Sequence, residues 1–109
     1  MANERQYLIT ILGTPDTIRV RFTTERDRVL AFTVQFEPWI EVAYRPAVRI
    51  DSQHERPHRD ILGWDGSTVR KDWDWEGADL PLNDALDQAI SDIKRNRIAY
   101  RAAFIRRKP

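Results

Sequence analysis

Residues 17–37, TIRVRFTTERDRVLAFTVQFE, alternate apolar and polar side chains in two runs that flank the polar turn at 25–27. Alternation with a period of two is typical of strands that bury one face. Two such strands joined by a short polar turn predict an antiparallel hairpin. The residues expected on its apolar face are Ile18, Val20, Phe22, Leu30, Phe32, Val34 and Phe36.

The same pattern continues on both sides of this hairpin. Residues 7–12 form a short apolar strand candidate, and a turn signal at 13–16 separates it from the hairpin. Downstream, the alternation resumes over 40–50, with Pro46 at an edge or a bulge. Strands joined by short turns predict a meander with one apolar face. The opposite face is expected to be solvated or to bind a partner, and its residues are Arg19, Arg21, Gln35, Glu41, Arg45 and Arg49.

The region 52–79 is polar and rich in turns. Gly63 and Gly66 lie between Ile61-Leu62 and Thr68-Val69 and predict a further hairpin. Trp73 and Trp75 follow and alternate with acidic residues. This alternation favours a strand whose tryptophans pack on the core, and an aromatic edge that binds a partner is the other interpretation.

The end of the chain predicts a helix over about 83–106. Its apolar residues recur with the period of one buried helical face. Asn83 or Asp84 is expected as the N-cap, with Asp87 in the first turn. The apolar stripe consists of Leu86, Ile90, Ile93, Tyr100 and Phe104, with Arg97 in its gap.

Together these elements predict a single α+β domain over residues 1–109. It is expected to contain a curved antiparallel sheet of about four to six strands in meander order, with one long C-terminal helix packed on the apolar face. The first part of the sheet is expected over about 6–51, and the polar histidine loop and the further hairpin over 52–79.

The composition excludes several classes of protein. The chain has no cysteine, which excludes disulfides, a thiolate nucleophile and cysteine-type zinc sites. It lacks the apolar run of about eighteen residues that a membrane span needs. The N-terminus MANERQYL carries charges where a signal peptide needs apolar residues. A cytoplasmic protein with no membrane contact is therefore expected.

Charge is unevenly distributed along the chain, although the net charge is only +1. Residues 60–92 contain 9 acidic and 2 basic side chains, whereas residues 93–109 contain 7 basic and no acidic ones. The basic end of the helix either binds phosphate or is a solvated terminus. Its candidate phosphate contacts are Arg95, Arg97, Arg101, Arg106, Arg107 and Lys108.

The stretch DSQHERPHRD, at 51–60, holds both histidines of the chain, His54 and His58. In one interpretation they bind a metal ion with Asp60, and Asp51 or a water molecule completes the coordination shell. An extended chain would place the two imidazoles about 13 Å apart, too far to share one ion. A turn in the chain could bring them together.

Two further interpretations of this stretch need no metal. In one, the histidines act as general acid and base in RNA cleavage, because imidazoles titrate near neutral pH, and Arg56 or Arg59 holds the phosphate. In the other, the stretch is a structural polar turn. In an extended chain His58 would share the face of Val48 and Ile50.

The run RIDSQHERPHRD resembles a motif of the TumE type of small prokaryotic proteins, which are toxin components of toxin–antitoxin pairs. The motif has an aspartate, a histidine, a Pro-His or Gly-His pair and a basic residue. The matching positions in this chain are Asp51, His54, Pro57, His58 and Arg59.

Two positions depart from that motif. Ile50 stands where an aromatic residue is usual, and Asp60 stands where a further histidine is usual. The second departure puts the same chemistry in doubt. The resemblance implies a small toxin-like protein that acts on RNA and has a cognate antitoxin as its partner.

Two functional hypotheses follow. The first is a toxin-like protein that cleaves RNA without a metal or other cofactor, in which His54 and His58 transfer protons and the neighbouring acids orient an imidazole. The second is a non-catalytic binding or oligomerisation module, such as a homodimer, in which the histidine loop is structural. The catalytic candidates are Asp51, His54, His58, Arg59 and Asp60, and the binding candidates are Arg56, Arg95, Arg97, Arg101 and Arg106.

Overall fold

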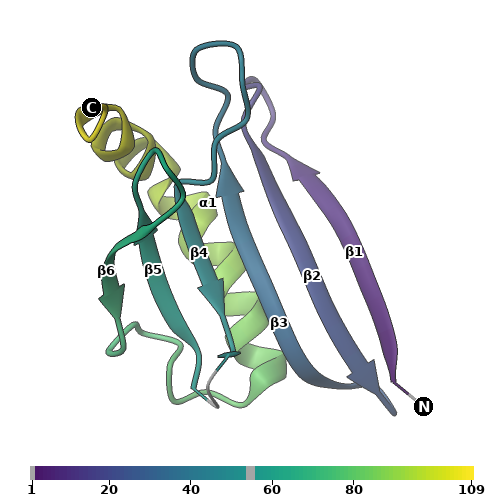
Figure 1. The fold of residues 1–109 in the computed structure, drawn as a ribbon. Coiled ribbons are helices and arrows are strands. Elements are labelled where there is room, and N and C mark those ends of the chain that lie inside the picture. Colours follow the sequence, from purple (N-terminus) through teal and green to yellow (C-terminus); the bar gives the residue numbers. More distant parts are fainter. Residues whose placement is uncertain (1, 54–55) are drawn as a thin grey trace.

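The computed structural model describes residues 2–53 and 56–109. Within them, one helix lies against an antiparallel sheet whose six strands follow chain order, β1-β2-β3-β4-β5-β6 (Figure 1). The predicted α+β meander with one C-terminal helix is therefore confirmed. The elements are β1 (Asn3–Thr10), β2 (Thr17–Glu25), β3 (Arg28–Glu37), β4 (Val48–Asp51), β5 (His58–Leu62), β6 (Thr68–Asp72) and α1 (Leu82–Arg106).

Strands β2 and β3 form the hairpin that their alternation predicts. Ile18 pairs with Phe36 and Val20 with Val34, and all four side chains are fully buried. A shift of register near the turn leaves Leu30 out of the pairing. Because such a bulge reverses which side chains face inward, Leu30 is 47% exposed, and its expected place on the apolar face is wrong.

Helix α1 covers one face of the sheet, behind β3, β4 and β5 in Figure 1, whereas β1 and β2 extend past it. It begins after Pro81 without a side-chain cap, so the predicted N-cap is wrong. The Asn83 side chain instead accepts a hydrogen bond from Val29 N at 2.9 Å and donates one to Asp27 O at 3.3 Å. These contacts tie the helix start to the β2–β3 turn. Among the described residues, no helix has the length and apolarity that crossing a membrane requires.

Strand β4 is shorter than the strand predicted over 40–50. Residues 39–47 form a loop that projects beyond the end of β3 (Figure 1). In it Glu41 and Val42 have positive φ angles of 52° and 56°, which lie outside the β region and interrupt an extended strand. Glu41 and Arg45 therefore lie in this loop rather than on the polar face of a strand.

The β5–β6 hairpin is present as predicted, with its turn at Gly63–Gly66. The tryptophans that follow do not lie on a strand, because β6 ends at Asp72. Trp75 packs in the core at 3% exposure, whereas Trp73 is 40% exposed. Only one of the two tryptophans therefore has the predicted core position.

Candidate functional site

The β4–β5 hairpin carries Asp51, His58 and Asp60 on the face of the sheet that α1 leaves uncovered, called the open face below. Asp51 pairs with His58 across the hairpin, and paired side chains project to the same side. Val48 and Ile50 face the core beneath α1. The expectation that an extended chain would put His58 on the side of Val48 and Ile50 is therefore wrong, because the chain reverses between β4 and β5.

Asp51, His58 and Asp60 form a buried group, called the acid–imidazole cluster below. His58 Nε2 lies 3.3 Å from Asp51 Oδ1 and 3.6 Å from Asp60 Oδ2. Lys71 of β6 adds a positive charge, with Nζ 3.5 Å from His58 Nε2 and 3.5 Å from Asp60 Oδ1. The structure thus brings together three of the predicted catalytic residues. His54 lies outside the described residues.

His58 is held from several sides and is 1% exposed. Its Nδ1 lies 3.1 Å from the carbonyl oxygen of Arg56. Since a carbonyl oxygen only accepts hydrogen bonds, Nδ1 carries the proton. The ring of Trp73 lies 4.7 Å from the imidazole, centroid to centroid, and helps to cover it. Asp51 and Asp60 are buried nearly as deeply, at 4% exposure each, so a polymeric substrate would first meet the arginines around the cluster.

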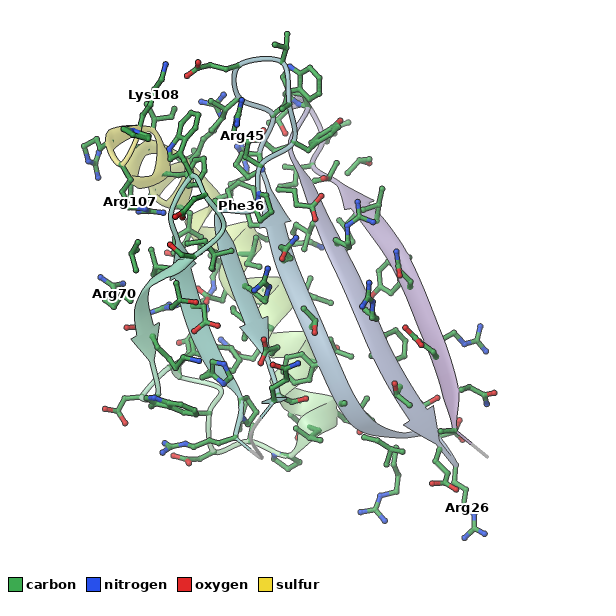
Figure 2. All side chains as sticks on the ribbon, in the orientation of Figure 1. Arg26, Phe36, Arg45, Arg70, Arg107 and Lys108 are labelled. Atoms are coloured by element: carbon green, nitrogen blue, oxygen red, sulfur yellow. The ribbon has the colours of Figure 1, made fainter. Side chains whose placement is uncertain are left out.

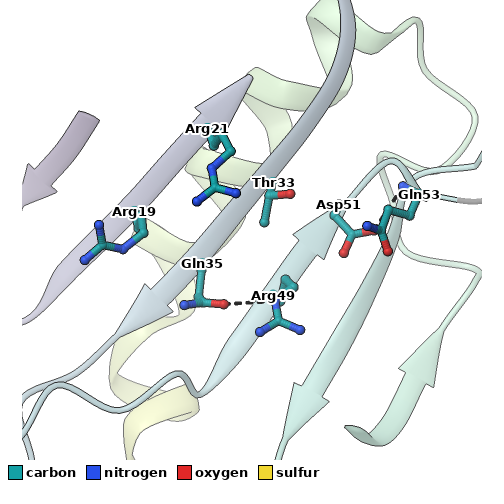
Figure 3. Close-up of a pocket in the computed structure, with 7 residues that line it drawn as sticks. All are labelled: Arg19, Arg21, Thr33, Gln35, Arg49, Asp51 and Gln53. Carbon is teal, nitrogen blue, oxygen red and sulfur yellow. Dashed lines mark hydrogen bonds between the residues drawn. The ribbon is translucent and has the colours of Figure 1, made fainter. Parts of the chain in front are cut away.

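A pocket of about 330 Å³ lies on the open face next to the cluster (Figure 3). Strands β2, β3 and β4 contribute its walls, and the turn after β4 closes one end. Asp51 belongs both to this pocket and to the cluster. The lining residues are Arg19, Arg21, Thr33, Gln35, Arg49, Asp51 and Gln53.

The three arginines of the pocket differ in the number and closeness of their ion-pair and hydrogen-bond partners. Arg19 makes a bidentate pair with Glu37, at 2.9 and 3.3 Å. Arg49 donates through Nε to Gln35 Oε1 at 2.9 Å (Figure 3), and its two Nη groups make no hydrogen bond with the described part of the chain. Arg21 is 56% exposed at its side chain, and its only ion pair among the described residues is a long one, with Nε 3.7 Å from Oε1 of the exposed Glu4. Arg49 and Arg21 are therefore the groups most available to an anion.

Arg59 points away from this pocket, although it lies between His58 and Asp60 in the sequence. On the helix side of the sheet it donates to Asp72 Oδ2 at 2.9 Å and to Tyr100 Oη at 3.0 Å. Burial alone would lower the pKa of Arg59, but Tyr100 and the acids around it raise the pKa above its ordinary value. Its guanidinium is thus charged and already engaged.

Asp92 of α1 anchors the same network, and sequence analysis did not single it out. It is 1% exposed and accepts hydrogen bonds from Trp75 Nε1 at 3.0 Å, Asn96 Nδ2 at 2.6 Å and Tyr100 Oη at 2.9 Å. Burial and the Asp92 carboxylate together raise the pKa of Tyr100 well above its ordinary value. The available signal was an acid between Ala89 and Ile93 on the apolar side of the helix.

Arg56 lies beside the cluster but points toward other acids. Its Nη2 is 3.3 Å from Asp79 Oδ1 and 3.9 Å from Asp74 Oδ1. Its Nε is buried without a hydrogen bond to the described residues. Arg56 thus borders the segment after β6 rather than the arginine pocket.

The basic end of the helix lies on the other side of the sheet from the pocket. Arg95 pairs with Glu76, and Arg101 lies 3.5 Å from Asp16 Oδ2. Arg97 is half-buried, and Arg106 is exposed. The predicted tail contacts therefore share no surface with the acid–imidazole cluster.

The last residues of the chain close the end of the fold, where Arg45, Arg107 and Lys108 gather (Figure 2). Arg107 donates to the carbonyl oxygen of Leu62 at 2.9 and 3.1 Å, and Lys108 pairs with Glu41 at 2.7 Å. Both basic residues therefore have structural contacts in place of a free phosphate-binding surface.

Comparison with known proteins gives a family and no activity. Residues 1–109 match the model of a family described as a domain of unknown function (DUF7718). No curated protein and no solved structure matches the chain. The resemblance to TumE-type toxins stays a prediction from the sequence motif.

Proposed function

The chain belongs to the DUF7718 family, and we propose that it is a cytoplasmic toxin-like protein that binds RNA on the open face of its sheet and cleaves it there. The observation that carries this proposal is the pocket in which three arginines adjoin Asp51 of the acid–imidazole cluster. A guanidinium offers phosphate a planar pair of donors. A carboxylate beside bound phosphate offers a proton acceptor.

Arg49 and Arg21 are the phosphate contacts in this proposal. Arg49 is fixed through Nε to Gln35, so its two Nη groups are held in one orientation over the pocket. Fixing a donor before the ligand arrives reduces the entropy lost on binding. The exposed Arg21 would reach a second phosphate along the strand. Phosphate contacts of this kind bind without sequence preference.

Asp51 is the proton acceptor in the proposed cleavage. It would take the proton of a ribose 2′-hydroxyl as that oxygen bonds to the adjacent phosphorus. The bond from phosphorus to the 5′-oxygen then breaks, and water protonates the leaving oxygen. Arg49 would stabilise the charge that develops on the phosphate. His58, behind Asp51 at 3.3 Å, would be a positioning residue.

RNA binding is tested with a fluorescent single-stranded oligonucleotide and the Arg49→Gln variant. We expect Arg49→Gln to weaken binding about tenfold, by the loss of one charged contact to phosphate. The slope of log K against log salt should fall by about 0.7, the value for one phosphate on single-stranded nucleic acid. Arg26→Gln, at the exposed β2–β3 turn (Figure 2), is the matched control and should change neither quantity.

Cleavage of the same oligonucleotide is measured by gel electrophoresis. Growth arrest is measured after expression of the protein is induced in a bacterial host. Wild type should cut RNA and slow growth, and Asp51→Asn should do neither while it still binds. If Arg49→Gln binds RNA as tightly as wild type does, the proposed RNA-binding surface is wrong. Binding without cleavage or growth arrest contradicts the toxin activity and leaves a binding module.

A second candidate function, association through a sheet edge, is favoured by β1. It is an outer strand of the sheet, and Tyr7 and Leu8 on it are 43% and 52% exposed. An exposed edge strand can pair with a strand of another chain, either a second copy or an antitoxin. Light scattering of the purified chain tests for the homodimer, and Leu8→Lys should make it monomeric.

A further inference from the structure

We infer that the acid–imidazole cluster binds a divalent transition-metal ion through Asp51, His58 and Asp60. These residues each offer one ligand atom, and the three atoms lie within 4.8 Å of one another. Two of the separations, 3.3 Å and 3.6 Å, join His58 Nε2 to the two carboxylates. Ligands about 2.0–2.2 Å from a tetrahedral zinc ion are about 3.3–3.6 Å apart. The spacing therefore suits one shared ion.

The orientation of His58 supports the same inference. Nδ1 donates to the carbonyl oxygen of Arg56 at 3.1 Å, so Nε2 is the ring nitrogen that is left to face the two acids. Metal-binding histidines characteristically donate their other ring N–H to a carbonyl or a carboxylate. Nε2 faces Asp51 and Asp60, which carry lone pairs. The two carboxylates repel each other, so the position between them and Nε2 favours a cation, either the Lys71 ammonium group or a metal ion.

Asp60 provides an independent observation. Its side chain is 6% exposed, and Oδ1 is buried without a hydrogen bond to the described residues. A buried carboxylate oxygen without a hydrogen bond is costly. Since Oδ2 is the oxygen that faces His58 Nε2, a shared ion would satisfy Oδ1 if Asp60 binds it through both carboxylate oxygens.

Lys71 supplies the cluster with a positive charge, but its contacts are loose. Its Nζ lies 3.5 Å from both His58 Nε2 and Asp60 Oδ1, whereas charge-assisted hydrogen bonds are about 2.7–2.9 Å long. The side chain comes from the edge strand β6 and is 34% exposed. It can therefore move into solvent when a metal ion binds, and it competes with that ion for the two acids.

The donor set indicates the class of ion. One imidazole and two carboxylates suit ions from manganese to zinc, and calcium is disfavoured because it takes six to eight oxygen ligands. Asp51 also lines the arginine pocket, so a bound ion would lie at the border of that pocket. The inference does not depend on the proposed RNA activity, although the two sites would share Asp51.

Zinc binding by the metal-stripped chain is measured by titration calorimetry, with Zn²⁺ alone as the ligand. We expect one site per chain, with affinity about tenfold or more lower in Asp60→Asn, which loses a ligand charge at nearly constant shape. Lys71→Met should raise the affinity about tenfold, because it removes the competing ammonium group. His54→Gln is the matched control for the other histidine of the chain and should bind as wild type does.

The position of the ion is read independently from tryptophan fluorescence. Co²⁺ should quench Trp73, whose ring lies 4.7 Å from that of His58, centroid to centroid, and the quenching should be smaller in Trp73→Phe. Absence of Zn²⁺ binding, or equal affinity in Asp60→Asn and wild type, overturns the inference. Loss of binding in His54→Gln with retention in Asp60→Asn assigns the metal to another site and overturns it as well. Arg49→Gln should keep full zinc affinity, so failure of the RNA proposal is distinguishable from failure of this one.

Discussion

The two faces of strand β5 carry two groups of charged side chains, one on the helix side and one on the open face. They differ in how closely their members are hydrogen-bonded and ion-paired. His58, Arg59 and Asp60 are consecutive, and the strand alternation sends the middle one to the helix side. There Arg59 meets Asp72 at 2.9 Å and Tyr100 at 3.0 Å. On the open face, by contrast, the contacts of His58 Nε2 are 3.3–3.6 Å long.

This difference separates a structural network from a candidate site. A buried polar network in which every member is hydrogen-bonded fixes one arrangement of the core. A buried oxygen without a hydrogen bond to the described part of the chain, such as Asp60 Oδ1, calls for an explanation by function or by a ligand. The helix-side network therefore holds α1 to the sheet, and the open-face cluster is the place to look for chemistry.

Removal of the Asp92 carboxylate should have the largest effect on the stability of the fold. Asp92→Ala removes one of the carboxylates that pair with the Arg59 guanidinium. It also removes the hydrogen-bond acceptor of Trp75 Nε1 and Tyr100 Oη. We expect the free energy of unfolding to fall by about 3 kcal/mol, the usual cost of breaking a buried charge pair. Urea denaturation measures it. Asp87→Ala, on the exposed side of the same helix, should change it by less than about 0.5 kcal/mol.

Removal of an acid on the open face should lower the free energy of unfolding far less. Asp60→Asn removes one of two acids that face the same imidazole, and relief of their repulsion offsets the lost contact to Lys71. We expect the unfolding free energy of the metal-free protein to change by less than about 1 kcal/mol. A loss as large as that of Asp92→Ala would make the open-face cluster a structural network too.

Periodicity predicted the parts of this fold that depend on local alternation. The buried faces of β2 and β3 and the extent of α1 follow from one strand period and one helical period. The open-face positions of Arg19, Arg21 and Arg49 follow from the same alternation. The extension of β4 to residue 40 failed because positive φ angles at 41 and 42 break the strand, and no glycine marks them.

The candidate site was predicted by residue type rather than by geometry. The motif selected Asp51 and His58, Asp60 was a candidate by residue type although it departs from the motif, and the structure brings the three together. It also selected Arg59, whose side depends on where the chain reverses between β4 and β5. No local pattern fixes that position. The contribution of Lys71 depends on pairing between strands that are distant in sequence, which single-sequence periodicity does not report.

The smallest expected effect concerns Asp72, at the solvent border of the helix-side network. Burial alone would raise the pKa of Asp72, but hydrogen bonds from Arg59 and Arg70 outweigh it and hold the pKa below its ordinary value. A depressed pKa in the folded state stabilises the fold above the unfolded pKa of about 3.9, and this contribution disappears as the pH falls through the folded pKa.

Asp72→Asn should therefore lower the free energy of unfolding near neutral pH by less than about 1 kcal/mol, because the carboxylate is partly solvated. Below the folded-state pKa of Asp72 the variant and wild type should converge, since the wild-type carboxyl is then protonated as well. Urea denaturation of both proteins from about pH 2 to 7 tests this. A difference that stays constant with pH would mean that Asp72 acts through packing, and that the charge of Arg59 is balanced by Asp92 alone.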